Sequence, residues 1–188
     1  MLSLRGSFVA LVTPFTPDDR VNHALLRDLV EWHIEQGTNG LVPVGTTGES
    51  PTLNYEEHEA VIETVVEAAA GRVPVVAGTG SNSTREAVHM THHAKMTGAD
   101  AALIVLPYYN RPSQAGLIAH IERLNEVGMP LVIYNIPSRT GINMEVPTFE
   151  RLSHLDNVVG VKEASGSINQ ISEVVMATAD RCQVMSGD

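Results

Sequence analysis

The sequence predicts an α/β fold of the (β/α)8 TIM-barrel type, and three observations support this. Short apolar runs rich in β-branched residues alternate with amphipathic stretches, with a period of about 25 to 35 residues that fits a βα module. The short runs are almost continuously apolar, which indicates strands buried on both faces of a parallel sheet. Polar segments rich in Gly and Pro follow these runs, as active-site loops do in a barrel. Repeated βα units also fit a doubly wound sheet, but the polar loops favour the barrel.

Seven segments are predicted to be strands. They are residues 8–13, 40–44, 73–78, 101–106, 131–135, 158–163 and 182–186. A complete barrel has eight strands and takes about 250 residues. The 188 residues of this chain are therefore expected to form an incomplete barrel, as one partial catalytic domain over residues 1–188.

The predicted helices carry start and stop signals. Asn22 precedes apolar residues at helical spacing, while Asn54 and Ser83 are each followed three residues later by a glutamate, as in a capping box. Glycines that suit the left-handed cap after a helix stand at Gly37, Gly71, Gly98 and Gly128. Further helices are expected near residues 113–126, 148–155 and 169–179.

The composition excludes several classes of function. The formal net charge is −10, and no basic stripe is present, so nucleic acid is not an expected partner. The apolar runs are far shorter than the roughly 20 residues that span a bilayer, and residues 8–12 are too short for a signal peptide. We therefore expect a cytoplasmic protein without a membrane partner. Cys182 is the only cysteine, which excludes an intrachain disulfide and a cysteine zinc cluster and predicts a packing role.

Lys162 lies in VVGVKEAS, near the carboxyl end of an otherwise apolar predicted strand. Desolvation there would lower its pKa and leave neutral amine, which attack on a ketone requires. The alternative is a lysine whose ammonium group reaches water at the strand end. The strand context alone leaves both interpretations open.

Two further loops carry polar residues. In YNIPSRT, Tyr134 is either a core ring with a satisfied hydroxyl or a reactive phenol, and Arg139 in the following loop is either solvated or clamps a carboxylate. In GTTGES, residues 45–50, two glycines bracket Thr46 and Thr47, so backbone N–H groups could converge on an anion while the hydroxyls reach a reacting group. The alternative is a turn of ordinary geometry. The loop is not a Walker motif, because no Gly-Lys-Ser or Gly-Lys-Thr follows.

GTTGES, PYYNRPSQ, YNIPSRTG, GVKEAS and the terminal SGD together match one family in order and spacing over the whole chain. The sequence resembles the first two thirds of a dihydrodipicolinate synthase, within the superfamily of pyruvate-dependent class I aldolases and N-acetylneuraminate lyase. The resemblance implies a Schiff-base lyase that condenses pyruvate with L-aspartate 4-semialdehyde in lysine (diaminopimelate) biosynthesis. It implies no metal or organic cofactor, and a missing C-terminal portion with the eighth strand and a helical domain.

The resemblance also assigns roles to residues. Lys162 would form an imine with the C2 ketone of pyruvate, and Tyr134 would act as general acid and base. Thr46 would link the hydroxyl of Tyr134 to that of Tyr109, which members of the family supply across a subunit interface. A homo-oligomer is therefore implied, as a dimer of dimers (homotetramer). Members that sense lysine bind it at the dimer interface, in a site matched here by His58, Asn82, Glu86 and Tyr108.

The substrates' acid groups are assigned to two loops. Thr47, with Gly45 and the neighbouring amides, would hold the pyruvate carboxylate, and Arg139 would hold the acid group of the semialdehyde. At the lysine site the chain departs from the family at Pro51 and Tyr55, where sensitive members often carry alanine and histidine. Those departures put affinity for lysine in question.

Three alternatives stay open. The chain could be a related aldolase, acting on N-acetylneuraminate or on 2-keto-3-deoxy sugar acids, although Arg139 favours the synthase because it suits an acidic aldehyde. It could also be a non-catalytic fragment.

His89, His92 and His93 have the spacing of metal ligands on a helix, but we expect no metal because no carboxylate is seen to complete the set. The sequon at Asn82 is expected to be a helix cap.

Overall fold

A computed structural model describes residues 2–179 and 181–187 of the chain. The chain divides into two compact units, each discontinuous in sequence. Unit 1 comprises Met1–Thr79 and His93–Ala102, and unit 2 comprises Gly80–His92 and Leu103–Asp188. Helix α3 (Thr84–Thr97) and strand β4 (Ala101–Val105) contribute residues to both units.

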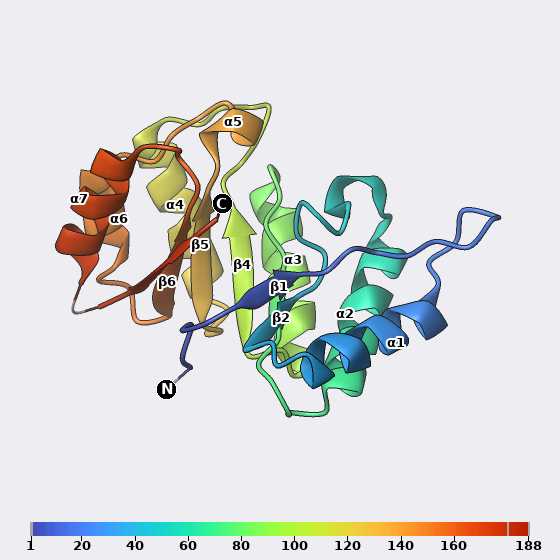
Figure 1. Cartoon of the computed structure of the whole chain (residues 1–188). Helices are drawn as coiled ribbons and strands as arrows, with labels where there is room; N and C mark the ends of the chain where they lie inside the picture. The colour runs from blue at the N-terminus through green and yellow to red at the C-terminus, as the bar shows by residue number, and fades with distance from the viewer. Residues whose placement is uncertain (1, 180, 188) are drawn as a thin grey trace. The chain divides into compact units, whose positions relative to one another are not determined.

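Unit 1 is built on short parallel strands with two long helices. Its own elements are β1 (Phe8–Ala10), α1 (His23–Glu35), β2 (Gly40–Val42), the 3-10 helix η1 (Ser50–Thr52), α2 (Tyr55–Ala69) and β3 (Val76–Gly78). β1 pairs in parallel with β2, and a parallel bridge joins Leu41 to Val75, just before β3. Helices α1 and α2 pack against each other beside these strands (Figure 1).

Unit 2 is a parallel sheet with helices on one face. Its own elements are α4 (Gln114–Asn125), β5 (Leu131–Asn135), α5 (Pro137–Thr140), α6 (Val146–Leu152), β6 (Val158–Glu163), α7 (Ile168–Thr178) and β7 (Gln183–Ser186). β5 pairs in parallel with β6, and β6 with β7. Helices α4, α6 and α7 form a layer along these strands, with α6 packed on both neighbours (Figure 1).

The strand order follows the sequence order. β3, β4, β5, β6 and β7 are successive neighbours, and the Ala101 N–H donates to the Val75 carbonyl within unit 1, so β4 begins beside β3. A doubly wound sheet reverses its strand order at a switch point, and the described residues contain no such reversal. The α/β class and the seven predicted strands are confirmed, with the order that successive βα units give in a barrel.

Prolines account for two of the strands that are shorter than predicted, β2 and β3. β5 and β6 have the predicted bounds. β2 ends at Val42 rather than at residue 44, because Pro43 has no N–H for the ladder and Val44 adopts a left-handed φ of 46°. β3 begins after Pro74, which restricts the start of that segment in the same way.

The predicted helix caps form, with one correction. Asn22 and Asn54 both cap their helices, and Asn54 makes a full capping box with Glu57. At the third site the Ser83 hydroxyl accepts from the Glu86 N–H, but the Glu86 carboxylate accepts from the Ser81 hydroxyl at 2.7 Å instead of closing the box. All four predicted stop glycines have left-handed φ values, of 84°, 70°, 94° and 69° along the chain.

Two short helices, η1 and α5, were not predicted. Each has a proline in its first turn, where the absent N–H would be unpaired in any case. The prediction of a loop around Arg139 is therefore wrong, because this residue lies in α5. Pro147 likewise lies in the first turn of α6, which begins at Val146, two residues before the predicted start.

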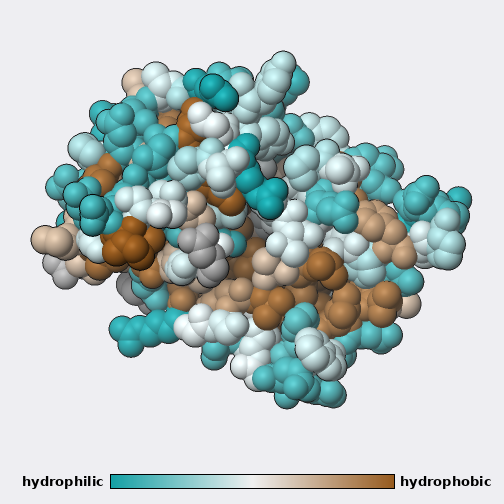
Figure 2. Space-filling view, turned by 45° about the horizontal axis from the view of Figure 1, so that its top comes forward, coloured by the Kyte–Doolittle hydropathy of each residue, from teal (hydrophilic) through white to brown (hydrophobic). Residues whose placement is uncertain are grey.

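Apolar side chains fill both units, and Cys182 is among them. Its thiol lies 3.4 Å from the Val158 carbonyl, and burial raises its pKa to about 11, which confirms a packing role. Figure 2 shows hydrophilic residues over much of the visible face, with hydrophobic residues gathered between them. Large apolar side chains that remain exposed include Met96, Ile168 and Met176. Over the described residues, no helix is long and apolar enough to cross a membrane.

Candidate active site

Lys162 and Tyr134 meet at the carboxyl ends of β6 and β5. The two residues are direct partners in the parallel register, so their side chains leave the same face of the sheet. The Lys162 Nζ atom lies 4.5 Å from the centroid of the Tyr134 ring. Tyr134 is buried, and burial lowers the pKa of the Lys162 amine below its ordinary value of 10.5. This geometry provides an amine with an increased neutral fraction beside a phenol.

Gly187 leaves space for the lysine side chain. A Cβ atom on Gly187 would lie 3.3 Å from Lys162 Cε, 3.4 Å from Lys162 Cγ and 2.6 Å from Ala164 Cβ. The Gly187 N–H donates to the Glu163 carbonyl at 2.9 Å, which fixes the backbone in this position. The glycine of the terminal SGD therefore has a steric reason that sequence analysis did not identify.

The GTTGES loop is a compact turn in unit 1. The Gly45 carbonyl accepts from the N–H groups of Gly48 at 3.1 Å and Ser50 at 3.4 Å, and Glu49 has a left-handed φ of 60°. The Thr13 hydroxyl donates to the Gly48 carbonyl at 2.7 Å. These bonds hold the loop in one shape and use several of its polar groups.

The two glycines of this loop differ in their need for space. A Cβ atom on Gly48 would lie 3.0 Å from the Leu11 carbonyl oxygen, whereas one on Gly45 would meet nothing closer than 3.9 Å. In the described part of the chain, the N–H groups of Thr46 and Thr47 donate to no backbone carbonyl. The loop can therefore offer two adjacent amides and two hydroxyls to an anion.

Tyr109 and Arg139 both present their side chains to solvent in unit 2. Tyr109 is 90% exposed and has a left-handed φ of 72°, which costs a non-glycine residue about 1 to 2 kcal/mol. Arg139 is exposed on α5. Beside α5, the guanidinium of Arg111 packs so closely on Gly141 that a Cβ atom there would lie 2.8 Å from Arg111 Nε. Sequence analysis did not single out Arg111.

Three of the four residues matched to a lysine site lie in unit 2. Burial raises the pKa of Tyr108, the negative charge of Glu86 raises it further, and a hydrogen bond with Ser81 lowers it. The Asn82 carbonyl accepts from the Asn110 amide at 3.0 Å. The fourth residue, His58, is buried in unit 1, where its Nε2 lies 2.8 Å from the Gly78 carbonyl oxygen.

The predicted catalytic residues thus fall into two sets. Unit 1 holds Gly45, Thr46 and Thr47, and unit 2 holds Tyr109, Tyr134, Arg139 and Lys162. The structure brings Tyr134 and Lys162 into contact. The joining of the two sets into one site stays a prediction.

One of the three histidines of α3, His93, has carboxylates nearby, contrary to expectation. His93 lies 3.6 Å from a Glu59 carboxylate oxygen and 3.4 Å from one of Glu63, and its Nε2 lies 3.1 Å from the Thr97 hydroxyl. The described residues nevertheless contain no group of three or more ligands that could hold a metal ion. His93 instead joins α3 to α2 within unit 1.

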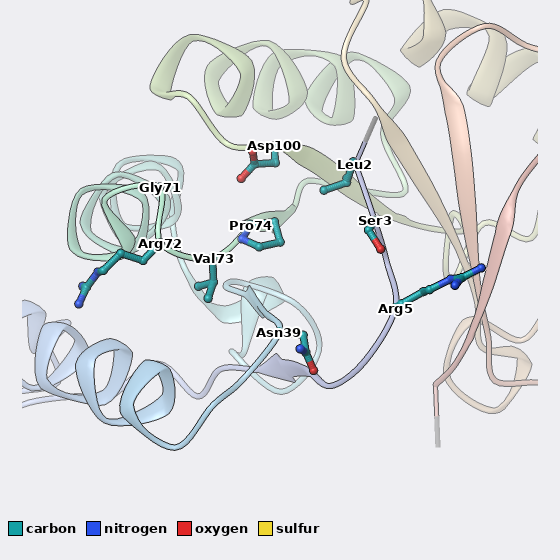
Figure 3. Close-up of a pocket in the computed structure, with 9 residues that line it drawn as sticks. All are labelled: Leu2, Ser3, Arg5, Asn39, Gly71, Arg72, Val73, Pro74 and Asp100. Carbon is teal, nitrogen blue, oxygen red and sulfur yellow. The ribbon is translucent and has the colours of Figure 1, made fainter.

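A pocket of about 470 Å³ in unit 1 is unrelated to the predicted site. It is lined by residues of the N-terminal segment and of the turns before the strands, among them Leu2, Asn39 and Asp100 (Figure 3). The side chains of Arg5 and Arg72 extend away from the others, and Arg72 binds the Glu31 carboxylate at 2.7 and 2.5 Å. Its described lining residues include no predicted site residue.

The family is decided by comparison with known proteins. The family model described as "Dihydrodipicolinate synthetase family" matches residues 3–188. The chain belongs to this family. A curated 4-hydroxy-tetrahydrodipicolinate synthase from Geotalea uraniireducens is 54% identical over 185 residues, which are 98% of this chain and 63% of that relative. The chain thus spans less than two thirds of the length of this curated relative.

Solved structures of the dihydrodipicolinate synthetase family share the fold. The chloride-inhibited enzyme from Acinetobacter baumannii, complexed with pyruvate, has a TM-score of 0.97 and 48% identity over 99% of this chain and 64% of that one. The enzyme from Cyanidioschyzon merolae with lysine bound has a TM-score of 0.93 and 38% identity over 97% of this chain and 63% of that one. These likenesses confirm the predicted fold class.

The close approach at Gly187 predicts the effect of a substitution there. Gly187→Ala should displace the Lys162 side chain, because its new methyl group would overlap with Ala164 and crowd the lysine stem. We expect a loss of about 1 to 3 kcal/mol in the free energy of unfolding, as for other overpacked sites. Adding Ala164→Gly should recover part of it. Thermal denaturation of the wild-type protein, Gly187→Ala and the double variant measures this. Unchanged stability of Gly187→Ala would contradict the proposed crowding.

Proposed function

We propose that this protein is a lyase that condenses pyruvate with L-aspartate 4-semialdehyde, as a 4-hydroxy-tetrahydrodipicolinate synthase, and that it serves lysine biosynthesis in the cytoplasm. The observation that carries the proposal is the contact between a desolvated Lys162 and Tyr134 at adjacent strand ends. The name of the curated relative supports the same reaction. The alternative of a non-catalytic chain offers no reason to place a lysine in this desolvated position.

The proposed chemistry begins on Lys162. Its neutral amine attacks C2 of pyruvate, and loss of water leaves an imine between Nζ and C2. The protonated imine withdraws electrons, so C3 loses a proton and becomes an enamine carbon. This carbon forms a bond to the aldehyde carbon of the semialdehyde, whose oxygen takes up a proton. The imine itself is the electron sink, so the reaction requires no metal or organic cofactor.

Tyr134 is the proposed general acid and base. Its ring lies against the Lys162 amine, so its hydroxyl is held near the atoms that gain and lose protons. We assign Thr46 the role of linking this hydroxyl to Tyr109. The 90% exposure of Tyr109 suits a residue that completes the site of a partner subunit. The proposed assembly is a homo-oligomer, a dimer of dimers.

Anionic groups of the substrates have two proposed binding points. The hydroxyl of Thr47 and the amides of Thr46 and Thr47, with Gly45, suit the pyruvate carboxylate, because these two amides make no backbone hydrogen bond in the described chain. Arg139 suits the acid group of the semialdehyde. An aldolase for neutral sugar-derived aldehydes has less use for a cation here, which favours the synthase over the related aldolases.

Trapping of the imine tests the central assignment. Pyruvate followed by borohydride should leave a reduced adduct on Lys162 of the intact gene product, located by peptide mass spectrometry, while Lys162→Ala should leave none. The trapping rate should rise with pH, because the protonated amine is not a nucleophile. It should level off at a pH below 10.5, since burial lowers the pKa of this amine. An adduct on another residue of the active protein would remove Lys162 from this role.

Substitution of Arg139 tests the binding of the second substrate. Arg139→Ala should raise KM for the semialdehyde about tenfold, equivalent to one charge-assisted hydrogen bond of about 1.5 kcal/mol. Pyruvate trapping should be unchanged. Arg123→Ala is the matched control, because Arg123 is an exposed arginine of α4 that pairs with Glu126. Steady-state kinetics with each substrate varied measure the effect, and an unaltered semialdehyde KM excludes Arg139 from the site.

Feedback by lysine is a further part of the proposal. The contact of Tyr108 with Glu86 through Ser81 places a carboxylate and a phenol where an ammonium group could bind, and a relative has been solved with lysine bound. We assign the site to His58, Asn82, Glu86 and Tyr108. Millimolar lysine should lower the activity, and Glu86→Gln should weaken this inhibition at least tenfold while basal activity stays the same. Activity that is insensitive to lysine would exclude the site.

A further inference from the structure

A buried polar pair lies next to the Lys162 and Tyr134 pair, on the opposite face of the sheet. Asn135 and Glu163 are partners in the same parallel register, one residue further along each strand. Both side chains are 0% exposed. Because successive side chains alternate between the faces of a strand, this pair points away from the face that carries Tyr134 and Lys162.

The two side chains are bonded directly to each other. Asn135 Nδ2 donates to Glu163 Oε1 at 3.1 Å and Oε2 at 3.2 Å, and also to Asn143 Oδ1 at 2.8 Å. Glu163 Oε1 accepts in addition from the Ser165 N–H at 2.8 Å, and Asn135 Oδ1 accepts from the Met144 N–H at 3.1 Å. The pair therefore joins β5 to β6 and closes the loop that follows each strand.

A second layer of amides completes the network. Gln170 Nε2 donates to Asn143 Oδ1 at 3.0 Å and to Glu163 Oε2 at 3.4 Å, while Asn143 Nδ2 donates to Gln170 Oε1 at 2.7 Å. In the described chain, the Glu163 carboxylate has no ion-pair partner and is held by N–H groups alone. A buried carboxylate without a cation is costly to desolvate, and an apolar pair of similar size could fill such a place at less cost. The pair therefore calls for a reason other than stability.

The register of β5 on β6 supplies that reason. The pairing shifts between Leu131 and Val132, where the partners change from Val158 to Gly160 and Val159 is passed over. A bulge of this kind leaves the register beyond it to be fixed by other contacts, and a slip by one residue would turn every later side chain to the opposite face. The bond between Asn135 and Glu163 fixes the register three residues after the bulge, at the point where Tyr134 must face Lys162.

The same bonds also restrain the segment that carries Arg139. This segment runs from Asn135 to Met144, and the bond from the Met144 N–H to Asn135 Oδ1 ties its two ends together. Helix α5, with Arg139, lies inside the closed segment. The Asn135 and Glu163 pair thus restrains both the strand that carries Lys162 and the segment that carries Arg139.

We propose that Asn135 and Glu163 are positioning residues, which hold Tyr134 and Lys162 in register across β5 and β6 by a buried hydrogen bond. The proposal rests on the function proposed above, in which Lys162 forms the imine. Neither residue touches the reacting atoms, since both side chains lie on the far face of the sheet.

Exchange of the two functional groups tests this positioning. Glu163→Gln places an amide donor against the Asn135 amide, and Asn135→Asp places a second carboxylate against Glu163. Each single variant should lower kcat and the rate of pyruvate trapping at least tenfold, with a smaller change in KM for pyruvate. The double variant Asn135→Asp with Glu163→Gln faces a carboxylate with an amide again, and should recover at least a third of the wild-type kcat.

A matched control separates positioning from stability. Thr148→Val removes another side-chain hydrogen bond of unit 2, from the hydroxyl of the buried Thr148 to the half-buried Gln114 at 2.7 Å. This control should lower the melting temperature and leave kcat unchanged. If the single variants keep the wild-type kcat, the positioning role is wrong. It is also wrong if they lose no more activity than Thr148→Val does for the same decrease in melting temperature.

Two further measurements keep the result decisive. Should both single variants fail to fold, the double variant decides: a folded double variant with less than a tenth of the wild-type kcat contradicts the proposal, and recovered activity supports it. Gln170→Ala, which removes a contact at the edge of the network, should lower kcat by a smaller factor.

Absence of any pyruvate adduct in the wild-type protein would overturn the proposed function itself, and the positioning role with it. A wild-type adduct together with unaffected variants would overturn only the positioning role.

Discussion

The parallel register of β5 on β6 is the constraint on which the candidate site depends. It sets Tyr134 opposite Lys162 on one face and Asn135 opposite Glu163 on the other. The period of two along a strand means that both pairs are placed correctly together or displaced together. The covalent chemistry and the buried network are therefore two results of one alignment, which lies beyond a bulge in the same pair of strands.

Burial makes this alignment chemically useful. The strands that carry the site are apolar and enclosed, so the Lys162 amine loses hydration and its pKa falls. The same burial would penalise the Glu163 carboxylate, which is instead satisfied by backbone and amide N–H groups. Lys162 and Glu163, adjacent residues of β6, thus respond to burial in different ways. The pKa of the Lys162 amine falls, whereas the Glu163 carboxylate accepts several hydrogen bonds.

The sequence predicted the parts of the fold that depend on local patterns. Strand periodicity located β5 and β6 to the residue, and the asparagine caps and stop glycines behave as their chemistry requires. Residues whose role depends on distant neighbours were not predictable in this way. Gly187 is needed because of Lys162 and Ala164, and the partner of Glu163 lies 28 residues away on another strand. The two short helices were missed because proline, which suits the first turn of a helix, also favours turns and loops.

The backbone at Tyr109 has a consequence for association. Its left-handed φ of 72° is held by a hydrogen bond from the Asn110 N–H to the Tyr108 carbonyl and by one from the Asn110 amide to Asn82. The backbone that carries this exposed ring is thus ordered during folding. A surface that receives the ring meets a loop whose backbone is already ordered, so the backbone entropy lost on contact is small. The backbone conformation at Tyr109 is therefore set within the isolated chain, before any contact forms.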